Sequence, residues 1–263
     1  MSVYADLHVH TTASDGSLAL ADVPAAAREA GVRVVGVTDH DRVHPGLEAP
    51  VAVRDGVTVV RGVELRVESD AGRVDLLGYG VRETAALSAE LDRIQRDRVE
   101  RARRMVARVE DRLGVSLDVP FEHGVGRPHV ARAVADATGE SVQWAFDELL
   151  GDDRPCYVAR DVPGFDEGVS LLAGACPLVA LAHPLRYPNP DAALALAADL
   201  DAVELYYPYG GDPDLAPVRR ALREHDCVPT GGSDAHDRRL GLAGLDAVAC
   251  ERVRDRLRDP PDG

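Results

Sequence analysis

Histidine and aspartate recur in short polar motifs along this chain of 263 residues, and both residue types bind divalent metals. The first motif, DLHVHTTASDG at residues 6–16, places His8 and His10 two residues apart. Alternate side chains of a strand point to the same face, so both imidazoles can reach one ion while Val9 packs behind them. Asp15 follows in the same motif and adds a carboxylate.

Later motifs add donors of the same kind: TDHD, VTVVRGVEL, GRVDLLGYG, LVALAHP and GGSDAH. Together with the first motif they hold nine candidate donors: His8, His10, Asp15, His40, Glu64, Asp75, His183, Asp234 and His236. One metal takes about four to six donors and a catalytic metal leaves a place for water, so this number predicts two or three ions sharing bridging carboxylates. Imidazole mixed with carboxylate suits manganese, with zinc or iron as alternatives.

Strand-like and helix-like segments alternate around these motifs, which predicts parallel βα units and the α/β class. The expected strands cover residues 3–9, 32–37, 57–65, 74–79, 178–182, 202–205 and 227–230, and a helix covers residues 20–30. The donors fall at the carboxyl ends of these strands. In a closed parallel barrel the active site is built at that end.

Residues 83–160 break the alternation. Apolar residues recur at spacings of three and four over residues 84–113, which predicts one long helix. A second helical stretch is expected over residues 130–150. We interpret this segment as a helical insertion over the barrel mouth, with the barrel built from residues 1–82 and 161–263. Two ordinary outer helices of the barrel are the alternative. The tail RDPPDG is expected to fray.

The charge balance is strongly acidic. The chain has 45 acidic and 30 basic residues, a formal charge of -15, and no lysine. Such a surface suits the salt-rich cytoplasm of a halophilic archaeon, where the screening length falls to about 3 Å at 1 M salt. A GC-rich genome that favours arginine codons is the alternative explanation. Either way, stable DNA binding is disfavoured.

The chain shows no sign of a membrane or secreted location. No stretch approaches the roughly 20 apolar residues of a membrane span, and the start lacks the pattern of a secretion signal. The four cysteines contain no CxxC pair, which predicts buried thiols and neither disulfides nor a cysteine zinc site. We therefore expect a cytoplasmic protein without membrane partners.

The motifs HVHTTASDG, TDHD, GVEL, AHP and GGSDAH, in this order, resemble those of the PHP (polymerase and histidinol phosphatase) family of metal-dependent phosphoesterases. The helical segment with GRPHVARAV, followed by CYV, is similar to the subgroup that hydrolyses nucleoside 3',5'-bisphosphates and trims short 5'-phosphorylated RNA. The resemblance implies a distorted (β/α)7 barrel and a phosphatase or phosphodiesterase acting through a metal-bound hydroxide.

The resemblance also implies three metal positions. They are formed by His8, His10, Glu64 and Asp234; by Glu64, the residue at position 75 and His183; and by Asp15, His40 and His236. All of these residues except Asp75 and His183 are also expected to be catalytic. A histidine is expected at position 75 in this subgroup. Aspartate there predicts altered geometry or metal preference and leaves open whether two or three ions bind.

Substrate choice is expected to come from the insertion. Arg127 and His129 in GRPH, at the start of an expected helix, can surround a phosphate with a guanidinium, an imidazolium and backbone N–H groups. Arg98 and Arg101 lie on one face of the long helix. They either face the same pocket or are solvated, because that helix is rich in arginine throughout.

Three further residues have two interpretations each, and a fourth, Glu204, has one. Asp6 either holds a ligand histidine from behind or caps its strand, and Glu204 is expected to support the site from a strand end. Tyr206 and Tyr207 either stack on a base or pack.

Two other functions remain open from the sequence. Histidinol-phosphate phosphatase shares the metal motifs but offers no use for the GRPH segment. A module that binds metals or a ligand without turnover is the non-enzymatic alternative, and the nearly complete donor set argues against it.

Overall fold

The computed structural model describes residues 2–258 of the chain. The tail that we expected to fray, apart from Arg258, lies outside the described residues. Contacts divide the chain into two units. Unit 1 contains the residues up to Ala89 and those from Val162 onward, and unit 2 is Glu90–Asp161.

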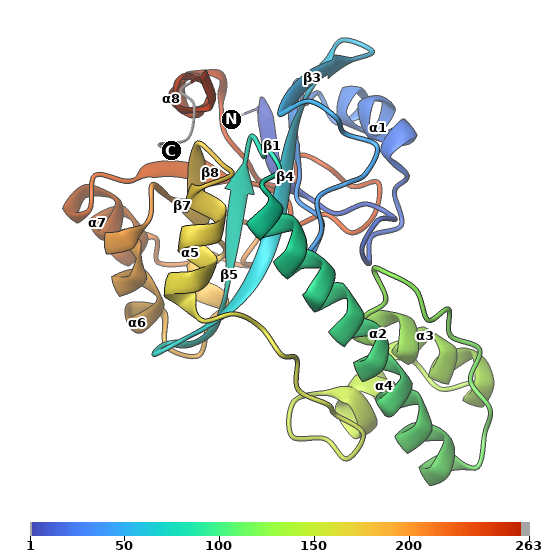
Figure 1. Cartoon of the computed structure of the whole chain (residues 1–263). Helices are drawn as coiled ribbons and strands as arrows, with labels where there is room; N and C mark the ends of the chain where they lie inside the picture. Colours follow the sequence, from blue (N-terminus) through green and yellow to red (C-terminus); the bar gives the residue numbers. More distant parts are fainter. Residues whose placement is uncertain (1, 259–263) are drawn as a thin grey trace. The chain divides into compact units, whose positions relative to one another are not determined.

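Unit 1 is built on an 8-stranded sheet (Figure 1). Its strands are β1 (Ala5–Val9), β2 (Val34–Val37), β3 (Val51–Arg54), β4 (Val57–Ser69), β5 (Gly72–Tyr79), β6 (Leu178–Leu181), β7 (Ala202–Tyr206) and β8 (Val228–Gly231). The order across the sheet is β1-β2-β4-β5-β6-β7-β8, and β3 pairs with β4 beside this path. The predicted α/β class is confirmed: the sheet curls into a half-barrel with helices around it. The sevenfold count of βα units stays a prediction.

The expectation of uniformly parallel βα units is wrong for the middle of the sheet. Strand β5 pairs antiparallel with both β4 and β6, because residues 70–71 join β4 to β5 as a tight hairpin with no helix between them. Strand β3 is also antiparallel to β4 and was not predicted. The remaining neighbours, β1·β2, β2·β4, β6·β7 and β7·β8, are parallel. Their carboxyl ends therefore share one edge of the sheet, together with the start of β5.

Short helices pack around this sheet. They are η1 (Leu20–Asp22), α1 (Val23–Glu29), α5 (Phe165–Ala173), η3 (Pro184–Arg186), α6 (Pro190–Ala195), η4 (Leu196–Asp199), α7 (Ala216–Glu224) and α8 (Ala247–Arg258). Helix α1 has Pro24 in its first turn, where a fixed φ suits the helix, and Gly31 follows its end with a φ of 76°. Helix α5 contacts β4, β5 and β6. Buried Val, Leu and Ala side chains of these elements form the core.

Unit 2 contains most of the long helix α2 (Ala85–Leu113), then α3 (Arg127–Thr138), α4 (Val142–Ala145) and a π-helical turn η2 (Phe146–Leu150). The predicted single stretch over residues 130–150 is wrong, because Gly139 ends α3 in the left-handed region and the Ser141 side chain caps α4. Unit 2 has its own core around Met105, Val109 and Val134.

Within residues 2–258, no helix combines the length and the apolar character needed to span a membrane.

Candidate metal centre

Glu64 lies at the centre of the donor residues. We expected it at the end of its strand, but β4 continues to Ser69 because it stays paired with β5, so Glu64 projects from the middle of the strand. It is completely buried. The site therefore forms where a long strand passes the carboxyl ends of its shorter parallel neighbours.

Four imidazoles contact the Glu64 carboxylate. Oε1 lies 3.4 Å from His8 Nε2 and 3.2 Å from His183 Nε2. Oε2 lies 3.3 Å from His10 Nε2 and 2.7 Å from His40 Nδ1. Burial alone would raise the pKa of Glu64, but His40 and His8 hold that pKa well below its usual range. Glu64 is thus an anion placed to bridge several positive charges.

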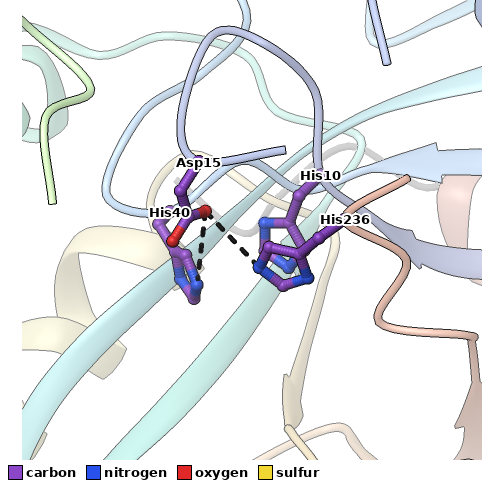
Figure 2. A group of neighbouring side chains, drawn as sticks. All are labelled: His10, Asp15, His40 and His236. Atoms are coloured by element: carbon purple, nitrogen blue, oxygen red, sulfur yellow. Dashed lines mark ion pairs between the residues drawn. The ribbon is translucent and has the colours of Figure 1, made fainter. Parts of the chain in front are cut away.

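Asp15 joins a second set of imidazoles (Figure 2). Its Oδ1 lies 3.9 Å from His40 Nε2 and 3.4 Å from His236 Nε2, and the ring of His10 lies 4.3 Å from that of His236. Although burial opposes it, the Asp15 carboxylate raises the pKa of His236 to about 9. The pKa of Asp15 is correspondingly held well below its usual value, chiefly by His40 against the effect of burial.

Asp234 completes the set around the two histidines of the first motif. Its Oδ1 lies 3.5 Å from His8 Nε2 and 3.1 Å from His10 Nε2. Its other oxygen, Oδ2, accepts hydrogen bonds from Tyr207 at 2.9 Å and from Arg186 at 3.1 Å. One oxygen therefore faces the imidazoles and the other is held by neighbours.

Asp75 and His183 form the remaining corner with Glu64. His183 Nε2 lies 3.7 Å from Asp75 Oδ2. Both oxygens of Asp75 accept from Arg66, Oδ1 from Nε at 2.7 Å and Oδ2 from Nη2 at 2.6 Å. The Asp75 carboxylate raises the pKa of Arg66 above its already high value.

These donors fit divalent metal ions. Three groups have ligand atoms within 4.8 Å of one another: His10, Asp15, His40 and His236; His8, His10 and Glu64; and Glu64, Asp75 and His183. His8 Nε2 is buried and has no hydrogen-bond partner among the described residues. A buried ring nitrogen with no hydrogen bond is costly, and coordination of a cation would satisfy it. The structure thus brings together all nine donors that the sequence singled out.

Glu204 on β7 supports two of these histidines. Its carboxylate lies 3.1 Å from His8 Nδ1 and accepts a hydrogen bond from the backbone N–H of His183 at 2.8 Å. Burial opposes protonation of His8, yet Glu204 first and Glu64 next raise its pKa well above the usual value. A carboxylate on Nδ1 directs Nε2 into the cluster, which is the usual arrangement behind a metal-binding histidine.

Two buried aspartates hold the loops that carry the donors. Asp39 accepts from the backbone and hydroxyl of Thr11 and from the Ser14 hydroxyl, at 2.7 to 2.8 Å. Asp6 accepts from Ser233 twice and from Gly241, at 2.6 to 2.8 Å. Of the two interpretations of Asp6, these bonds favour a structural one, because they join β1 to the loop after β8 and do not reach a ligand imidazole.

Glycines and strained residues bring the same loops close together. A Cβ on Gly232 would collide with the backbone of His8, and one on Gly16 would collide with the carbonyl of His10. His183 and Asp234 adopt positive φ values of 28° and 50°, which are unusual for residues with side chains. The motifs GGSDAH and HTTASDG therefore need their glycines for close approach of the backbone.

Unit 2 holds a separate cluster of arginines. Arg98 and Arg101 are 1% and 2% exposed, so the interpretation that they are solvated is wrong. Their guanidinium groups donate to the carbonyls of Val125 and Val158. Burial first, and then Arg160, Arg127 and Arg98, lower the pKa of Arg101 to about 9.

Arg127 and His129 lie in the first turn of α3, as predicted from GRPH. Arg127 donates to Asp152 at 2.9 Å, and its guanidinium lies 5.4 Å from the centre of the Tyr157 ring. His129 Nδ1 accepts the backbone N–H of Gly126 at 3.1 Å, so one ring nitrogen already caps the helix. A Cβ at Gly126 would lie 3.0 Å from Arg98 Nη2, which places that guanidinium at the same helix start.

Sequence reasoning missed Asp39, Arg66 and Arg186. Each was detectable: Asp39 flanks His40 in TDHD, Arg66 shares a strand face with Glu64, and Arg186 follows His183 by three residues. Of the two tyrosines, Tyr207 reaches the site through Asp234, whereas Tyr206 packs against the core.

Known proteins similar to this chain are phosphoesterases. A 3',5'-nucleoside bisphosphate phosphatase of Chromobacterium violaceum is 31% identical over 194 residues, covering 69% of this chain and 67% of the relative. A 5'-3' exoribonuclease of Haemophilus influenzae is 27% identical over 69% of each chain. A phosphoribosyl 1,2-cyclic phosphate 1,2-diphosphodiesterase of Eggerthella lenta is 29% identical over 88% of this chain and 93% of the relative.

Solved structures share the fold. A protein of Bifidobacterium adolescentis named as a metal-dependent phosphoesterase has a TM-score of 0.79 at 22% identity and covers 97% of both chains. An amidohydrolase of Chromobacterium violaceum, solved with sulfate and no metal, has a TM-score of 0.78 at 23% identity over 96% of both. No protein-family model matches the sequence. From the bisphosphate phosphatase relative and the donor cluster we conclude that the chain belongs to the PHP-type metal-dependent phosphoesterases, which are hydrolases.

Proposed function

We propose that this hydrolase cleaves phosphate monoesters of nucleotides such as nucleoside 3',5'-bisphosphates, or trims short 5'-phosphorylated RNA from its 5' end. The observation that carries the proposal is the convergence of four imidazoles on the buried Glu64 carboxylate. Phosphate monoesters repel hydroxide and hydrolyse very slowly without catalysis, so a cluster of cations at this place addresses the main barrier. The names of the Chromobacterium and Haemophilus relatives support the substrate class.

We propose that two or three manganese ions are held by the nine donors. Asp234 would join the group of His8, His10 and Glu64, and the other two groups would each hold one ion. Such ions supply hydroxide near neutral pH by lowering the pKa of water from 15.7 toward about 7, and they neutralise phosphate oxygens. The mixture of imidazole and carboxylate without thiolate favours manganese, with zinc or iron as alternatives.

Residues at the rim of this cluster are proposed to position the reacting phosphate. The Arg186 guanidinium lies between Asp234 and the Tyr207 hydroxyl, and its side chain is 53% exposed. An exposed guanidinium beside a metal site can bind phosphate oxygens in a fork. Glu204 would keep His8 in the tautomer that presents Nε2.

The arginines of unit 2 are proposed to bind a further phosphate group of the substrate. Arg98, Arg101, Arg127 and His129 gather at the start of α3, where backbone N–H groups and the helix dipole also favour an anion. Burial first, and then the positive charges of Arg160, Arg127 and Arg98, lower the pKa of Arg101. A bisphosphate or an oligonucleotide has a second phosphate that can neutralise the positive charge of these arginines, whereas histidinol phosphate has only one phosphate.

The acidic composition supports a proposal about the source of the protein. A net charge of -15 without lysine suits the salt-rich cytoplasm of a halophilic archaeon, and a GC-rich genome is the competing explanation for the arginine usage. Assays should therefore include high salt, because repulsion among surface acids can unfold such a protein in dilute buffer.

The decisive experiment is metal analysis of the purified protein followed by a hydrolysis panel in varied salt. Phosphate release is measured for the monoesters, and the products from RNA and from the cyclic ester are separated by chromatography. The panel contains adenosine 3',5'-bisphosphate, 5'-phosphorylated oligoribonucleotides, histidinol phosphate and a ribosyl 1,2-cyclic phosphate. We expect the first two to be the best substrates. Preference for histidinol phosphate or the cyclic ester would replace the proposed substrate, and no turnover by metal-loaded, folded protein would leave only a binding module.

A further inference from the structure

The pair formed by Arg66 and Asp75 distinguishes the position formed by Glu64, Asp75 and His183, called here the Asp75 corner, from the other two groups of donors. The two residues are directly opposite each other in the antiparallel ladder of β4 and β5. Their contact uses both nitrogens of a guanidinium fork and both oxygens of the carboxylate, at 2.7 Å and 2.6 Å. This is the strongest geometry available to such a pair.

The surroundings fix the pair in place. Asp75 is 1% exposed, and its backbone N–H donates to the Tyr187 hydroxyl at 2.8 Å. The backbone N–H of Arg66 donates to Asp41 at 3.1 Å. A partly buried ion pair held from both backbones is screened little by salt, so the positive charge of Arg66 is a permanent feature of this corner.

Asp75 differs from Asp234 in how its oxygens are used. Arg186 and Tyr207 occupy only Oδ2 of Asp234, which leaves Oδ1 facing His8 and His10. At Asp75 the oxygen nearest to His183, Oδ2, is the one that accepts from Arg66 Nη2. A cation bound between Glu64, Asp75 and His183 would therefore share a ligand oxygen with a guanidinium.

Two consequences follow from elementary electrostatics. The hydrogen bonds reduce the electron density that Asp75 can donate to a metal, and the guanidinium repels any cation a few ångströms away. The other two groups contain Asp15 and Asp234, which each keep an oxygen directed at imidazole nitrogens. The three positions are thus unequal in charge.

We propose that the Arg66–Asp75 pair makes the Glu64, Asp75 and His183 position a weak, exchangeable metal site, while the other two positions hold their ions tightly. The inference depends on the proposed function in that it assumes a metal centre, and it refines the number of ions. Arg66 supplies the positive charge at this corner whenever the third ion is absent. Occupancy of the third position would then follow the free metal concentration.

The test is a titration of metal-free protein with Mn²⁺, read from the electron paramagnetic resonance signal of free Mn²⁺ and without substrate. The wild-type protein is expected to bind two ions tightly and a third at least about tenfold more weakly. Arg66→Gln keeps a polar side chain, although a shorter one, and removes its charge, so it should tighten the third site about tenfold or more. The matched control is Arg73→Gln, because Arg73 lies in the same hairpin and pairs with the exposed Glu68 at 2.8 Å.

Arg66→Lys separates charge from shape and is expected to keep the third site weak, as in the wild type. Three equally tight ions in the wild-type protein would overturn the proposal without any variant, so the test does not depend on whether Arg66→Gln folds. An unchanged third site in folded Arg66→Gln, or tightening by Arg66→Lys as well, would also overturn it. Absence of any Mn²⁺ binding would instead remove the metal centre and with it the proposed function.

Discussion

The metal-donor cluster of unit 1 and the arginine cluster of unit 2 concentrate buried charge in opposite ways. Around Glu64, carboxylates and imidazoles come from β1, β4, β5 and the loops after β2, β6 and β8. Around Arg101, guanidinium groups come from α2, from the start of α3 and from Arg160. The first arrangement accumulates lone pairs, and the second accumulates N–H donors. Under the proposed function, the first cluster would bind cations and the second would bind a phosphate group of the substrate.

The largest effect on metal content and on hydrolysis is expected from a substitution in the metal-donor cluster of unit 1. Glu64→Gln keeps the shape of the side chain but removes the charge that four imidazoles share, so metal content should fall. Hydrolysis should drop by more than the roughly 100-fold typical of losing a group that only supports a ligand. Phosphate release and bound Mn²⁺ are measured together.

Glu68→Gln is the control for that variant, because Glu68 lies on the same strand and its side chain is 54% exposed. It should retain both metal and activity. Full Mn²⁺ content and normal turnover in Glu64→Gln would show that the cluster is not the metal centre.

Arg127→Ala tests whether the arginine cluster of unit 2 binds a phosphate group of the substrate. Loss of a charge-assisted contact to phosphate should raise KM for adenosine 3',5'-bisphosphate about 10- to 100-fold and leave 4-nitrophenyl phosphate nearly unaffected. Arg103→Ala, which removes an exposed arginine over the Phe121 ring, is the matched control. Equal losses on both substrates would reject a specific phosphate contact for Arg127.

The salt dependence of the free energy of unfolding is expected to report on the surface charges and not on the buried Glu64. Raising KCl from 0.1 to 2 M should increase the free energy of unfolding by on the order of 1 kcal/mol, because it screens repulsion among surface acids. Chemical denaturation measures the change, with sucrose as a control for solvent exclusion. Glu64→Gln should show the same salt dependence, and a flat response in the wild type would favour genome composition over halophily.

The smallest effect concerns His236 in the metal-free protein. Its pKa is raised from 6.5 to about 9, so its contribution to stability is complete below pH 6.5 and is lost as the pH rises to 9. His236 is 39% exposed, and screening limits this contribution to about 1 kcal/mol. Denaturation at pH 6 and pH 9 should show the loss in the wild type and not in His236→Asn. An equal loss in both proteins would assign it to other groups.

The sequence predicted that the nine candidate donors lie together, and the structure places them together, because each lies in a short motif next to an apolar strand. His8 and His10 follow from strand alternation, and Asp234 and His236 from a glycine-rich turn after β8. It could not predict that β5 runs antiparallel, because the GRVDLLGYG pattern is the same for either direction and the direction is set by pairing between β4, β5 and β6. For the same reason the contact between Arg66 and Asp75 was invisible, since it depends on the register of that hairpin.

The sequence also did not predict that Arg98 and Arg101 are buried. The arginine-rich pattern of α2 is typical of a solvated face, and only the packing of the unit 2 segments around α2 shows that Arg98 and Arg101 are enclosed. Long charged side chains can be buried when their donors meet carbonyls, a condition that depends on residues far away in the chain. Propensity and periodicity do not contain this information.

The most direct test of the metal centre is a crystal soaked in Mn²⁺ and measured at the manganese absorption edge. We expect anomalous peaks within about 2.3 Å of the donor atoms of His8, His10, Asp15, His40, Glu64, Asp234 and His236, with a weaker peak beside Asp75 and His183. Ordered donors with no anomalous peak among them would contradict this expectation.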